Sequence, residues 1–303
     1  MKRALVTGAA RRLGRAMALH LAGRGIDVAI HYASSVDEAE ATAAEARALG
    51  VTAETLRADL LQEAESRTLV ARAAKALGGP IDLLVNNASI FEHDSIRTGT
   101  RESWDRHIES NLRAPVALTQ DFAAQARKAV RQADGAALAQ ALVVNMLDQR
   151  VRKLTPEYMS YTVAKMGLWA FTQTAARALA PDIRVNAIGP GTTLQGARQT
   201  EEHFRGQRAG SVLERGADPE DICAALGYLI AARAVPHRAD QMACPRRPSR
   251  SLLRCRPGGR QQAGEHVGFG RAVQRRQAIA TGRQQAGGHQ ELHGRMKFLI
   301  API

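Results

Sequence analysis

Residues 4–32 read ALVTGAARRLGRAMALHLAGRGIDVAIHY, and this segment shows the unit that repeats along most of the chain. Ala4–Thr7 and Asp27–Tyr32 are short apolar runs of strand length, and the alanine-rich residues 13–24 between them have the composition of a helix. A strand, a helix and a second strand in this order predict a βαβ unit with parallel strands.

The same alternation continues to about residue 235, with further apolar runs separated by helical segments. Six strands joined by crossover helices predict an α/β fold. The sheet is expected to be parallel and doubly wound, with helices on both faces and a ligand crevice at the carboxyl ends of the strands. The other expected strands are Thr52–Ala58, Ile81–Asn86, Ala141–Met146 and Ile183–Ile188, and the other expected helices include residues 36–49, 100–132, 160–180 and 218–232.

Beyond Val235 the alternation stops. Residues 236–303 hold 12 Arg and 1 Lys against 3 acidic residues, a net charge of +10 out of +13 for the whole 303-residue chain. Arg, Gly and Gln dominate this segment, and no apolar period persists in it, so it cannot bury enough apolar surface to offset the entropy lost on ordering. We therefore predict a folded domain over residues 1–235 and a disordered basic tail over residues 236–303.

The cysteines and the apolar runs set the expected compartment. Cys223, Cys244 and Cys255 are too few and too far apart for a disulfide framework or a four-ligand zinc site, so no metal site is expected. No apolar run approaches the ~20 residues of a membrane span. Arg11 and Arg12 interrupt the apolar start before it reaches the length of a signal peptide. These features predict a cytoplasmic protein with no membrane partner.

A glycine-containing turn, TGAARRLG at residues 7–14, joins the first strand to the first helix. Gly8 permits a tight turn and Gly14 lets the helix pack closely on the strand. The helix start at Arg12 and Leu13 presents N–H groups to a pyrophosphate. A purely structural turn has the same appearance, so that alternative stays open, but the pattern favours a dinucleotide site.

The end of the second strand carries no acidic residue, although an NAD-specific site uses Asp or Glu there to bind the ribose 2′-OH. With Arg12 in the neighbouring loop, a 2′-phosphate is favoured and the predicted cofactor is NADPH. An ordinary loop role stays open for both serines of this segment, and Asp59 is equally readable as a helix N-cap. The expected cofactor contacts here are His31, Tyr32, Ser34 and Ser35, followed by Asp59 and Leu60 near the adenine and by Asn87 and Ala88 after the fourth strand.

Tyr161 and Lys165 stand four residues apart at the start of an expected long helix, so their side chains share one face. An ammonium group beside a phenol favours the phenolate and is expected to lower the phenol pKa from about 10. Such a tyrosine can serve as a proton donor near neutral pH. The pair is a candidate catalytic centre.

With these motifs in view, the chain resembles the short-chain dehydrogenase/reductase superfamily over residues 3 to about 235. The resemblance implies a Rossmann-like fold with Tyr161 as general acid. It also implies that Lys165 holds the nicotinamide ribose, that Asn111 anchors a proton-relay water, and that Pro190 and Gly191 border the nicotinamide. The matching motifs are Thr7-Gly8 to Gly14, Asn86-Asn87-Ala88, Asn111, Tyr161-x-x-x-Lys165, Arg184-Val185-Asn186 and Gly189-Pro190-Gly191.

Two departures indicate a subfamily. Arg12 replaces the usual middle glycine of the first loop, and Asp148 replaces the usual serine thirteen residues before the tyrosine. Both changes resemble the pteridine reductases and their dihydromonapterin-reducing relatives. This implies NADPH-dependent reduction of a pterin or folate-like substrate, with the proton passing through Tyr161. The residues expected to contact that substrate are Arg12, Ser89, Phe91, Asp148 and Tyr161.

Several alternatives stay open from the residues alone. Phe91 is also readable as a core aromatic and Asp148 as an acid that starts a loop. Carbonyl or 3-oxoacyl reduction within the same superfamily is the alternative activity. A non-enzymatic polyanion-binding arm is a further alternative, since the tail is basic. Aromatic residues such as Phe269 are too few there to offer much stacking, which makes a nucleic-acid partner the less favoured interpretation.

The resemblance ends near Val235. The family continues with Thr-Gly-Gln and a seventh strand, whereas this chain reads Pro236-His237-Arg238-Ala239-Asp240, so the seventh strand is expected to be missing. A one-base slip in the codons for His-Arg-Ala-Asp would restore Thr-Gly-Gln, which makes a frameshift a concrete hypothesis. The product would then be inactive or carry a dispensable tail. The family's tetramer, built through helices here at about residues 100–132 and 160–180, is the expected assembly, in doubt because of the tail.

Overall fold

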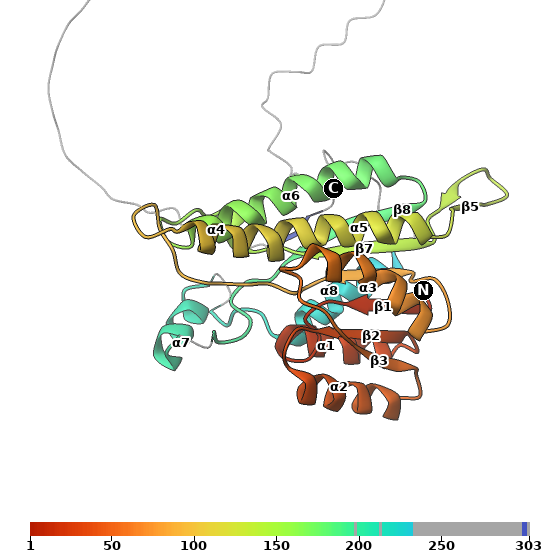
Figure 1. Cartoon of the computed structure of the whole chain (residues 1–303), viewed down its shortest axis with the longest axis horizontal. Coiled ribbons are helices and arrows are strands. Elements are labelled where there is room, and N and C mark those ends of the chain that lie inside the picture. The colour runs from red at the N-terminus through yellow and green to blue at the C-terminus, as the bar shows by residue number, and fades with distance from the viewer. Residues whose placement is uncertain (197–198, 212–213, 233–298, 302–303) are drawn as a thin grey trace, which may run out of the picture. The chain divides into compact units, whose positions relative to one another are not determined.

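The computed structural model describes residues 1–196, 199–211, 214–232 and 299–301 (Figure 1). Residues 1–243 and 296–303 belong to one compact unit, and a second unit, residues 244–295, lies outside the described residues. Most of the tail for which disorder was predicted, residues 236–298 and 302–303, also lies outside the described residues. In the described part of the chain, no helix is both long and apolar enough to cross a membrane.

Six parallel strands form the sheet in the order β3-β2-β1-β4-β7-β8, which confirms the predicted doubly wound topology. The strand order reverses between β1 and β4, so the loops that follow these two strands diverge and leave a crevice at their carboxyl ends. Each strand lies within two residues of its predicted start and end. The strands are β1 (Arg3–Val6), β2 (Asp27–Tyr32), β3 (Ala53–Arg57), β4 (Leu83–Asn86), β7 (Ala141–Met146) and β8 (Ile183–Gly189).

Alternation along the strands divides the core into two layers. Ala4 and Val6 of β1 face one buried cluster, and Leu5 between them faces the other, as the two-residue period of a strand requires. The first layer holds α1 (Arg12–Ala22), α2 (Val36–Ala48) and α8 (Pro219–Ala231), and the second holds α3 (Glu63–Ala76), α5 (Ala114–Gln125) and α6 (Met159–Leu179). Both faces of the sheet are therefore covered, as expected for parallel strands.

The helix expected over residues 100–132 is shorter and interrupted, which corrects the prediction. It consists of α4 (Arg101–Ile108), a π-helical turn η1 (Glu109–Arg113) and α5, which ends at Gln125. Asp182 accepts the Ala129 N–H at 2.9 Å and thereby holds the chain in a non-helical course. The hairpin of β5 (Val130–Arg131) and β6 (Ala137–Leu138) follows, turning at Gly135 with φ +82°.

The edge of the sheet beyond β8 carries one further short strand, β9 (Leu299–Ala301), from the end of the chain. It pairs antiparallel with β8, with Ala187 opposite Ala301 and Gly189 opposite Leu299. The predicted loss of the family's seventh strand concerns the segment after the last helix, and residues 233–298 lie outside the described residues. Among the described residues, the parallel part of the sheet ends at β8.

Candidate functional site

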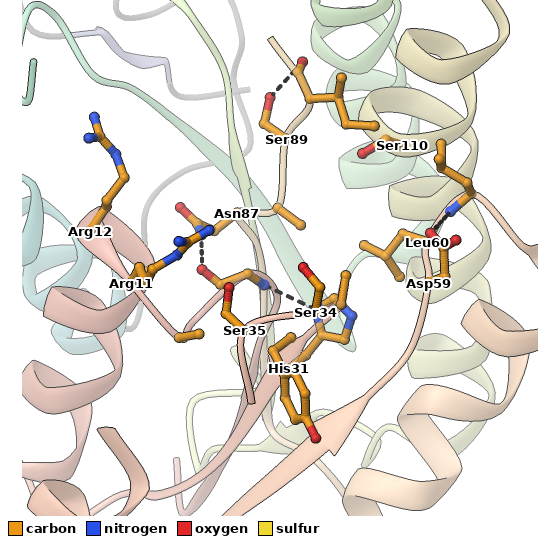
Figure 2. Close-up of a pocket in the computed structure, with 18 of the residues that line it drawn as sticks. Arg11, Arg12, His31, Ser34, Ser35, Asp59, Leu60, Asn87, Ser89 and Ser110 are labelled. Carbon is orange, nitrogen blue, oxygen red and sulfur yellow. Dashed lines mark hydrogen bonds between the residues drawn. The ribbon is translucent and has the colours of Figure 1, made fainter. Parts of the chain in front are cut away.

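A cleft of about 510 Å³ opens at the carboxyl ends of β1, β2 and β4 (Figure 2). It gathers segments that are far apart in the sequence, because parallel strands bring their carboxyl ends to the same edge. Arg106 and Ser110 also line it, and sequence reasoning missed both, since nothing in their local pattern signals a cleft. The predicted cofactor residues that line it are Gly8, Arg12, Leu13, Gly14, His31, Tyr32, Ser34, Ser35, Asp59, Leu60, Asn87 and Ala88.

The turn between β1 and α1 is built for close backbone approach. Gly8 has φ +61°, and a Cβ there would lie 3.0 Å from the Ala88 Cα. A Cβ on Gly14 would lie 2.1 Å from the Gly8 carbonyl oxygen, so only glycine fits. The N-cap residue of α1, Arg11, makes no side-chain cap hydrogen bond. The N-terminus of α1 is therefore suited to receive an anionic group.

The His31 side chain supports this turn through a hydrogen bond to its backbone. Its Nδ1 accepts the Gly8 N–H at 3.0 Å, so the proton lies on Nε2, which donates to the Ala58 carbonyl at 3.0 Å. Burial lowers the His31 pKa to about 4 and keeps the ring neutral. Both ring nitrogens are engaged with backbone groups. His31 therefore supports the Gly8 loop, and because it also lines the cleft its contact with a cofactor stays a prediction.

Asn87 fastens β4 to the same turn. Its Nδ2 donates to the Thr7 carbonyl at 2.8 Å and to the Gly8 carbonyl at 3.1 Å. The Thr7 hydroxyl in turn accepts the N–H groups of Asn87 and Ala88, each at 2.9 Å. These contacts satisfy backbone groups where β1 and β4 part. The two loops on either side of the crevice are thus held as one unit.

Arg11 and Arg12 point to different places (Figure 2). Arg11 pairs with Glu38 of α2 at 3.5 Å, which places it beside Ser34 and Ser35 at the end of β2. Arg12, with φ +54°, donates through Nη2 to the Leu194 carbonyl at 3.3 Å, in the loop after β8. The sequence predicts Arg12 as the partner of a 2′-phosphate. Both arginines line the cleft, but Arg11 lies on the side of the β2 end, whereas the left-handed backbone at Arg12 directs its side chain toward Leu194.

Asp148 and Tyr161 meet as predicted. Tyr161 donates from its hydroxyl to Asp148 Oδ2 at 3.0 Å, and Asp148 Oδ1 accepts the Arg150 N–H at 2.8 Å, which holds the carboxylate in place. Lys165 is buried and donates from Nζ to the Met146 carbonyl at 2.8 Å. The first turn of α6 and the end of β7 therefore bring the three side chains together.

The expected lowering of the Tyr161 pKa is wrong. Burial raises this pKa well above 10, and the charge of Asp148 and its hydrogen bond act in the same direction, against smaller opposing effects of Ser89 and Arg150. Burial also lowers the Lys165 pKa, to about 8. Tyr161 is thus held as a neutral phenol, the protonated state that a donor requires.

Phe91 lies in an aromatic group at the same centre. Its ring stacks on Tyr158, with centroids 4.1 Å apart and planes 6° apart, and meets Tyr161 edge-on at 4.7 Å and 72°. Phe91 remains 49% exposed, so it is not a core aromatic. Sequence reasoning missed Tyr158, whose ring reaches Phe91 because its backbone is left-handed, with φ +59°. Ser89, also predicted to contact substrate, lines the cleft.

Asn111 lies in the π-helical turn and is fully buried. Its side-chain amide accepts the Ile90 N–H at 2.9 Å and donates to the Ile90 carbonyl at 2.8 Å. These two hydrogen bonds therefore fix the backbone at Ile90, between Ser89 and Phe91. This arrangement assigns the Asn111 side chain to holding the loop after β4, where the family resemblance implied the anchoring of a water.

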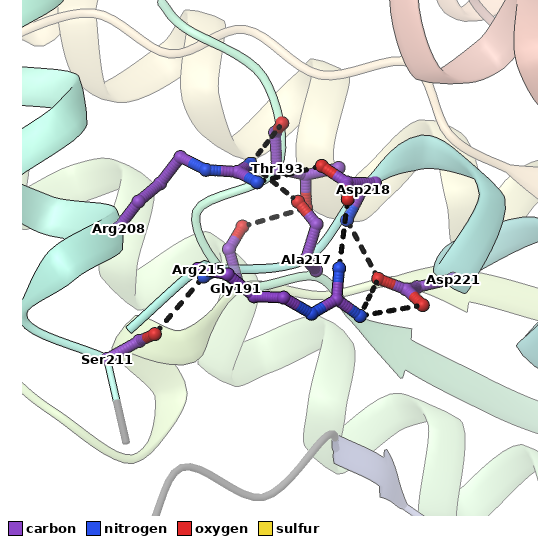
Figure 3. A network of polar contacts seen from close by, with 9 residues as sticks. Gly191, Thr193, Arg208, Ser211, Arg215, Ala217, Asp218 and Asp221 are labelled. Carbon is purple, nitrogen blue, oxygen red and sulfur yellow. Dashed lines mark hydrogen bonds and ion pairs between the residues drawn. The ribbon is translucent and has the colours of Figure 1, made fainter. Parts of the chain in front are cut away.

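Pro190 and Gly191 follow β8 at the start of a loop that a polar network ties down (Figure 3). Thr193 donates from its hydroxyl to the Gly191 carbonyl at 3.1 Å. Arg208 of α7 (Glu201–Ala209) donates to the Ala217 carbonyl at 2.9 Å and pairs with Asp218 at 2.8 Å. Neither Pro190 nor Gly191 lines the cleft described above. Arg208 carries no local sequence signal and was missed.

The chain is similar to known proteins of one family. Residues 2–205 match the sequence model of the family described as short chain dehydrogenase. A 3-oxoacyl-[acyl-carrier-protein] reductase FabG of Staphylococcus epidermidis is 31% identical over 77% of this chain and 93% of its own length. The structure of FolM alternative dihydrofolate reductase 1 from Brucella suis, in complex with NADP, is 42% identical over 77% of this chain and 89% of that chain, with a TM-score of 0.70. A short chain dehydrogenase from Burkholderia cenocepacia, also with NADP, is 31% identical over 76% of this chain and 90% of that chain, with a TM-score of 0.68.

Proposed function

This chain belongs to the short chain dehydrogenase family, and from that premise we propose that it is an NADPH-dependent reductase of a dihydropterin or dihydrofolate-like substrate. One observation carries the proposal: a carboxylate, Asp148, lies 3.0 Å from the Tyr161 hydroxyl. The exposed ring of Phe91 lies at the same centre. The FolM relative from Brucella suis, whose name states dihydrofolate reduction, supports the same assignment.

A carboxylate suits a pterin better than it suits a ketone. Reduction of a ketone builds negative charge on oxygen, which a hydroxyl or N–H donor stabilises and a nearby carboxylate opposes. Reduction of a C=N bond builds charge on a nitrogen that is then protonated. A carboxylate also accepts hydrogen bonds from paired N–H groups such as those of an amino-pyrimidine edge. Asp148 therefore fits a flat nitrogen heterocycle, and Phe91 offers a ring on which it can stack.

The cleft fits a nicotinamide dinucleotide carrying a 2′-phosphate. The glycine turn lets the backbone approach closely where a Cβ on Gly14 would clash with the Gly8 carbonyl oxygen, and the uncapped start of α1 suits the pyrophosphate. Arg11, Ser34 and Ser35 line the side where a 2′-phosphate would lie, and no acid of the β2 end competes for a ribose hydroxyl. We assign NADPH on these contacts, with Lys165 directed at the nicotinamide ribose.

In the proposed reaction each group has one task. Bound NADPH supplies the hydride that adds to the carbon of the C=N bond. As the electron pair of that bond moves to nitrogen, Tyr161 gives its hydroxyl proton to the nitrogen. The raised pKa of Tyr161 keeps the phenol protonated before transfer. In the free site Asp148 accepts this proton at 3.0 Å, so the hydroxyl turns from Asp148 to the substrate nitrogen as it donates, and Phe91 holds the ring plane.

Reduction of a 3-oxoacyl thioester is the second candidate, because FabG proteins of staphylococci are 31–35% identical to this chain. Against it stands Asp148, which occupies the position of the family's serine. We expect an Asp148→Ser variant to lose pterin reduction and to gain whatever carbonyl reduction the site supports. A comparison of the substrates reduced by Asp148→Ser and by wild type separates the two candidate functions.

The testing experiment follows NADPH oxidation with dihydrobiopterin, dihydromonapterin, dihydrofolate and an acetoacetyl thioester. We expect turnover with at least one pterin or folate, and a loss of about 100-fold in kcat for Asp148→Asn, within the usual range for proton-transfer groups. Asp105→Asn is the matched control, since the Asp105 side chain is half-exposed and pairs with Arg101 of the same helix. Turnover of the thioester alone would refute the pterin assignment.

We further propose the homotetramer that the resemblance implies. Trp104 of α4 and Val163 and Met166 of α6 are exposed apolar side chains on the two helices through which the superfamily associates. Light scattering of the purified chain tests this, and a monomer would refute it.

A further inference from the structure

The helix that carries Tyr161 lacks a cap of its own. Tyr158, the residue before α6, has φ +59° and ψ 45° and makes no side-chain cap hydrogen bond. The first N–H groups of a 21-residue helix need partners, and an unpaired buried N–H costs free energy. The partners here must come from another part of the chain.

Asp94, in the loop after β4, supplies them. Its carboxylate accepts the Ser160 N–H at 3.2 and 3.3 Å and the Ser160 hydroxyl at 2.5 Å, and its carbonyl accepts the Tyr158 N–H at 2.6 Å. Asp94 is 1% exposed. A negative charge at a helix N-terminus is also favoured by the helix dipole. Asp94 therefore caps α6 from 66 residues away in the sequence.

His107 completes a buried chain of hydrogen bonds. Its Nε2 accepts the Glu92 N–H at 3.1 Å, so its Nδ1 carries the proton and donates to the Ser160 hydroxyl oxygen at 2.6 Å. Ser160 then has only one direction for its own proton, toward Asp94. Burial lowers the His107 pKa, which favours the neutral ring. The proton positions on His107 and Ser160 are thus both fixed by this series of hydrogen bonds.

This network joins the two halves of the proposed site. Glu92 and Asp94 follow directly after Phe91 in the loop after β4, and Ser160 is the residue before Tyr161. A backbone bridge between Ser95 and Glu157 adds to the same joint. The edge-on contact of Phe91 with Tyr161, at 4.7 Å, is a consequence of this joining.

We propose that Asp94 is a positioning residue that sets the plane of the substrate on Phe91 relative to the Tyr161 hydroxyl. The proposal rests on the proposed function for the identity of the substrate. It depends only on Tyr161 acting as proton donor, so it applies equally if the substrate is a carbonyl compound. Asp94 touches neither substrate nor cofactor in this assignment.

The test compares Asp94→Asn and Ser160→Ala with wild type and with Ser95→Ala. Ser95 lies in the same loop, and its hydroxyl contacts only Thr98 and the Arg97 N–H. Each protein is titrated with NADPH, and kcat is expressed per NADPH-binding site. An incompletely folded variant loses binding sites and kcat together, so a merely structural role leaves this ratio unchanged.

For Asp94→Asn we expect the ratio to fall at least tenfold, with the Kd for NADPH within twofold of wild type. We expect a smaller fall for Ser160→Ala, which keeps the backbone cap, and no change for Ser95→Ala. If Asp94→Asn does not fold, Ser160→Ala decides the matter. Wild-type values of kcat per binding site in the variant that folds would overturn the proposal. If wild type reduces only thioesters, the pterin assignment fails, and the same ratio measured with the thioester still judges Asp94.

Discussion

Replacing Gly14 by Ala should have two opposing effects on the free energy of unfolding. Gly14 is the third residue of α1, and alanine in a helix is favoured over glycine by about 1 kcal/mol. Against this, the new Cβ would lie 2.1 Å from the Gly8 carbonyl oxygen and 2.6 Å from Asn87 Nδ2. Contacts of Cβ below 3.0 Å are essentially never seen, and the obstructing atoms are mostly backbone.

The steric effect is expected to win. Overpacking costs about 1–3 kcal/mol, and moving the Asn87 amide weakens its hydrogen bonds to Thr7 and Gly8, at about 1 kcal/mol each. After the helix gain is subtracted, we expect a net loss of about 3 kcal/mol. For a domain of about 150–250 residues that corresponds to a fall in Tm of roughly 6–12 °C. NADPH binding should weaken strongly, because the same shift moves the turn that faces the pyrophosphate.

Circular dichroism melting and a fluorescence titration with NADPH measure the two outcomes. Gly206→Ala in α7 is the matched control, since nothing lies within 4 Å of its Cβ position. That variant should be stabilised by up to about 1 kcal/mol, the helix gain alone. A Gly14→Ala protein that melts and binds NADPH like wild type would refute the argument from close packing.

Four further outcomes are expected. The His31 pKa is lowered from 6.5 to about 4, so between these pH values the unfolded chain binds more protons than the folded chain. The free energy of unfolding should therefore rise with pH from 4 to 6.5, and urea unfolding of His31→Gln should lose that rise. The Lys165 pKa is lowered from 10.5 to about 8, so the free energy of unfolding should likewise rise with pH from 8 to 10.5. Lys165→Met should remove this slope in the same assay. Arg11→Ala should raise the KM for NADPH about tenfold or more while leaving the KM for NADH nearly unchanged, and equal effects on both would contradict the 2′-phosphate assignment. Truncation after residue 235 should preserve NADPH binding in a fluorescence titration, since the lining of the cleft lies between Gly8 and Ser110, and loss of binding in a folded product would show that the later residues are required.

The strands and the positions of the catalytic residues were predictable because their signals are local. Short β-branched runs followed by helical segments specify parallel strands, and the sheet has six of them in the predicted places. The spacing of Tyr161 and Lys165 placed them on one helix face, and the family resemblance added Asp148 to the same centre, where it contacts Tyr161. The interruption of the helix at Gln125 was not predictable, since it depends on the distant Asp182.

Tertiary structure alone determined the directions and charges of the site. The sequence shows two adjacent arginines, but only the left-handed backbone at Arg12 separates their targets. The pKa of Tyr161 rises because of burial and the carboxylate of Asp148, whereas local spacing indicated only the ammonium of Lys165. Asp94 caps a helix 66 residues away. Periodicity and spacing encode which residues share a strand or a helix face, whereas burial and long-range contacts exist only after the chain has folded, and these decide protonation and hydrogen-bonding partners.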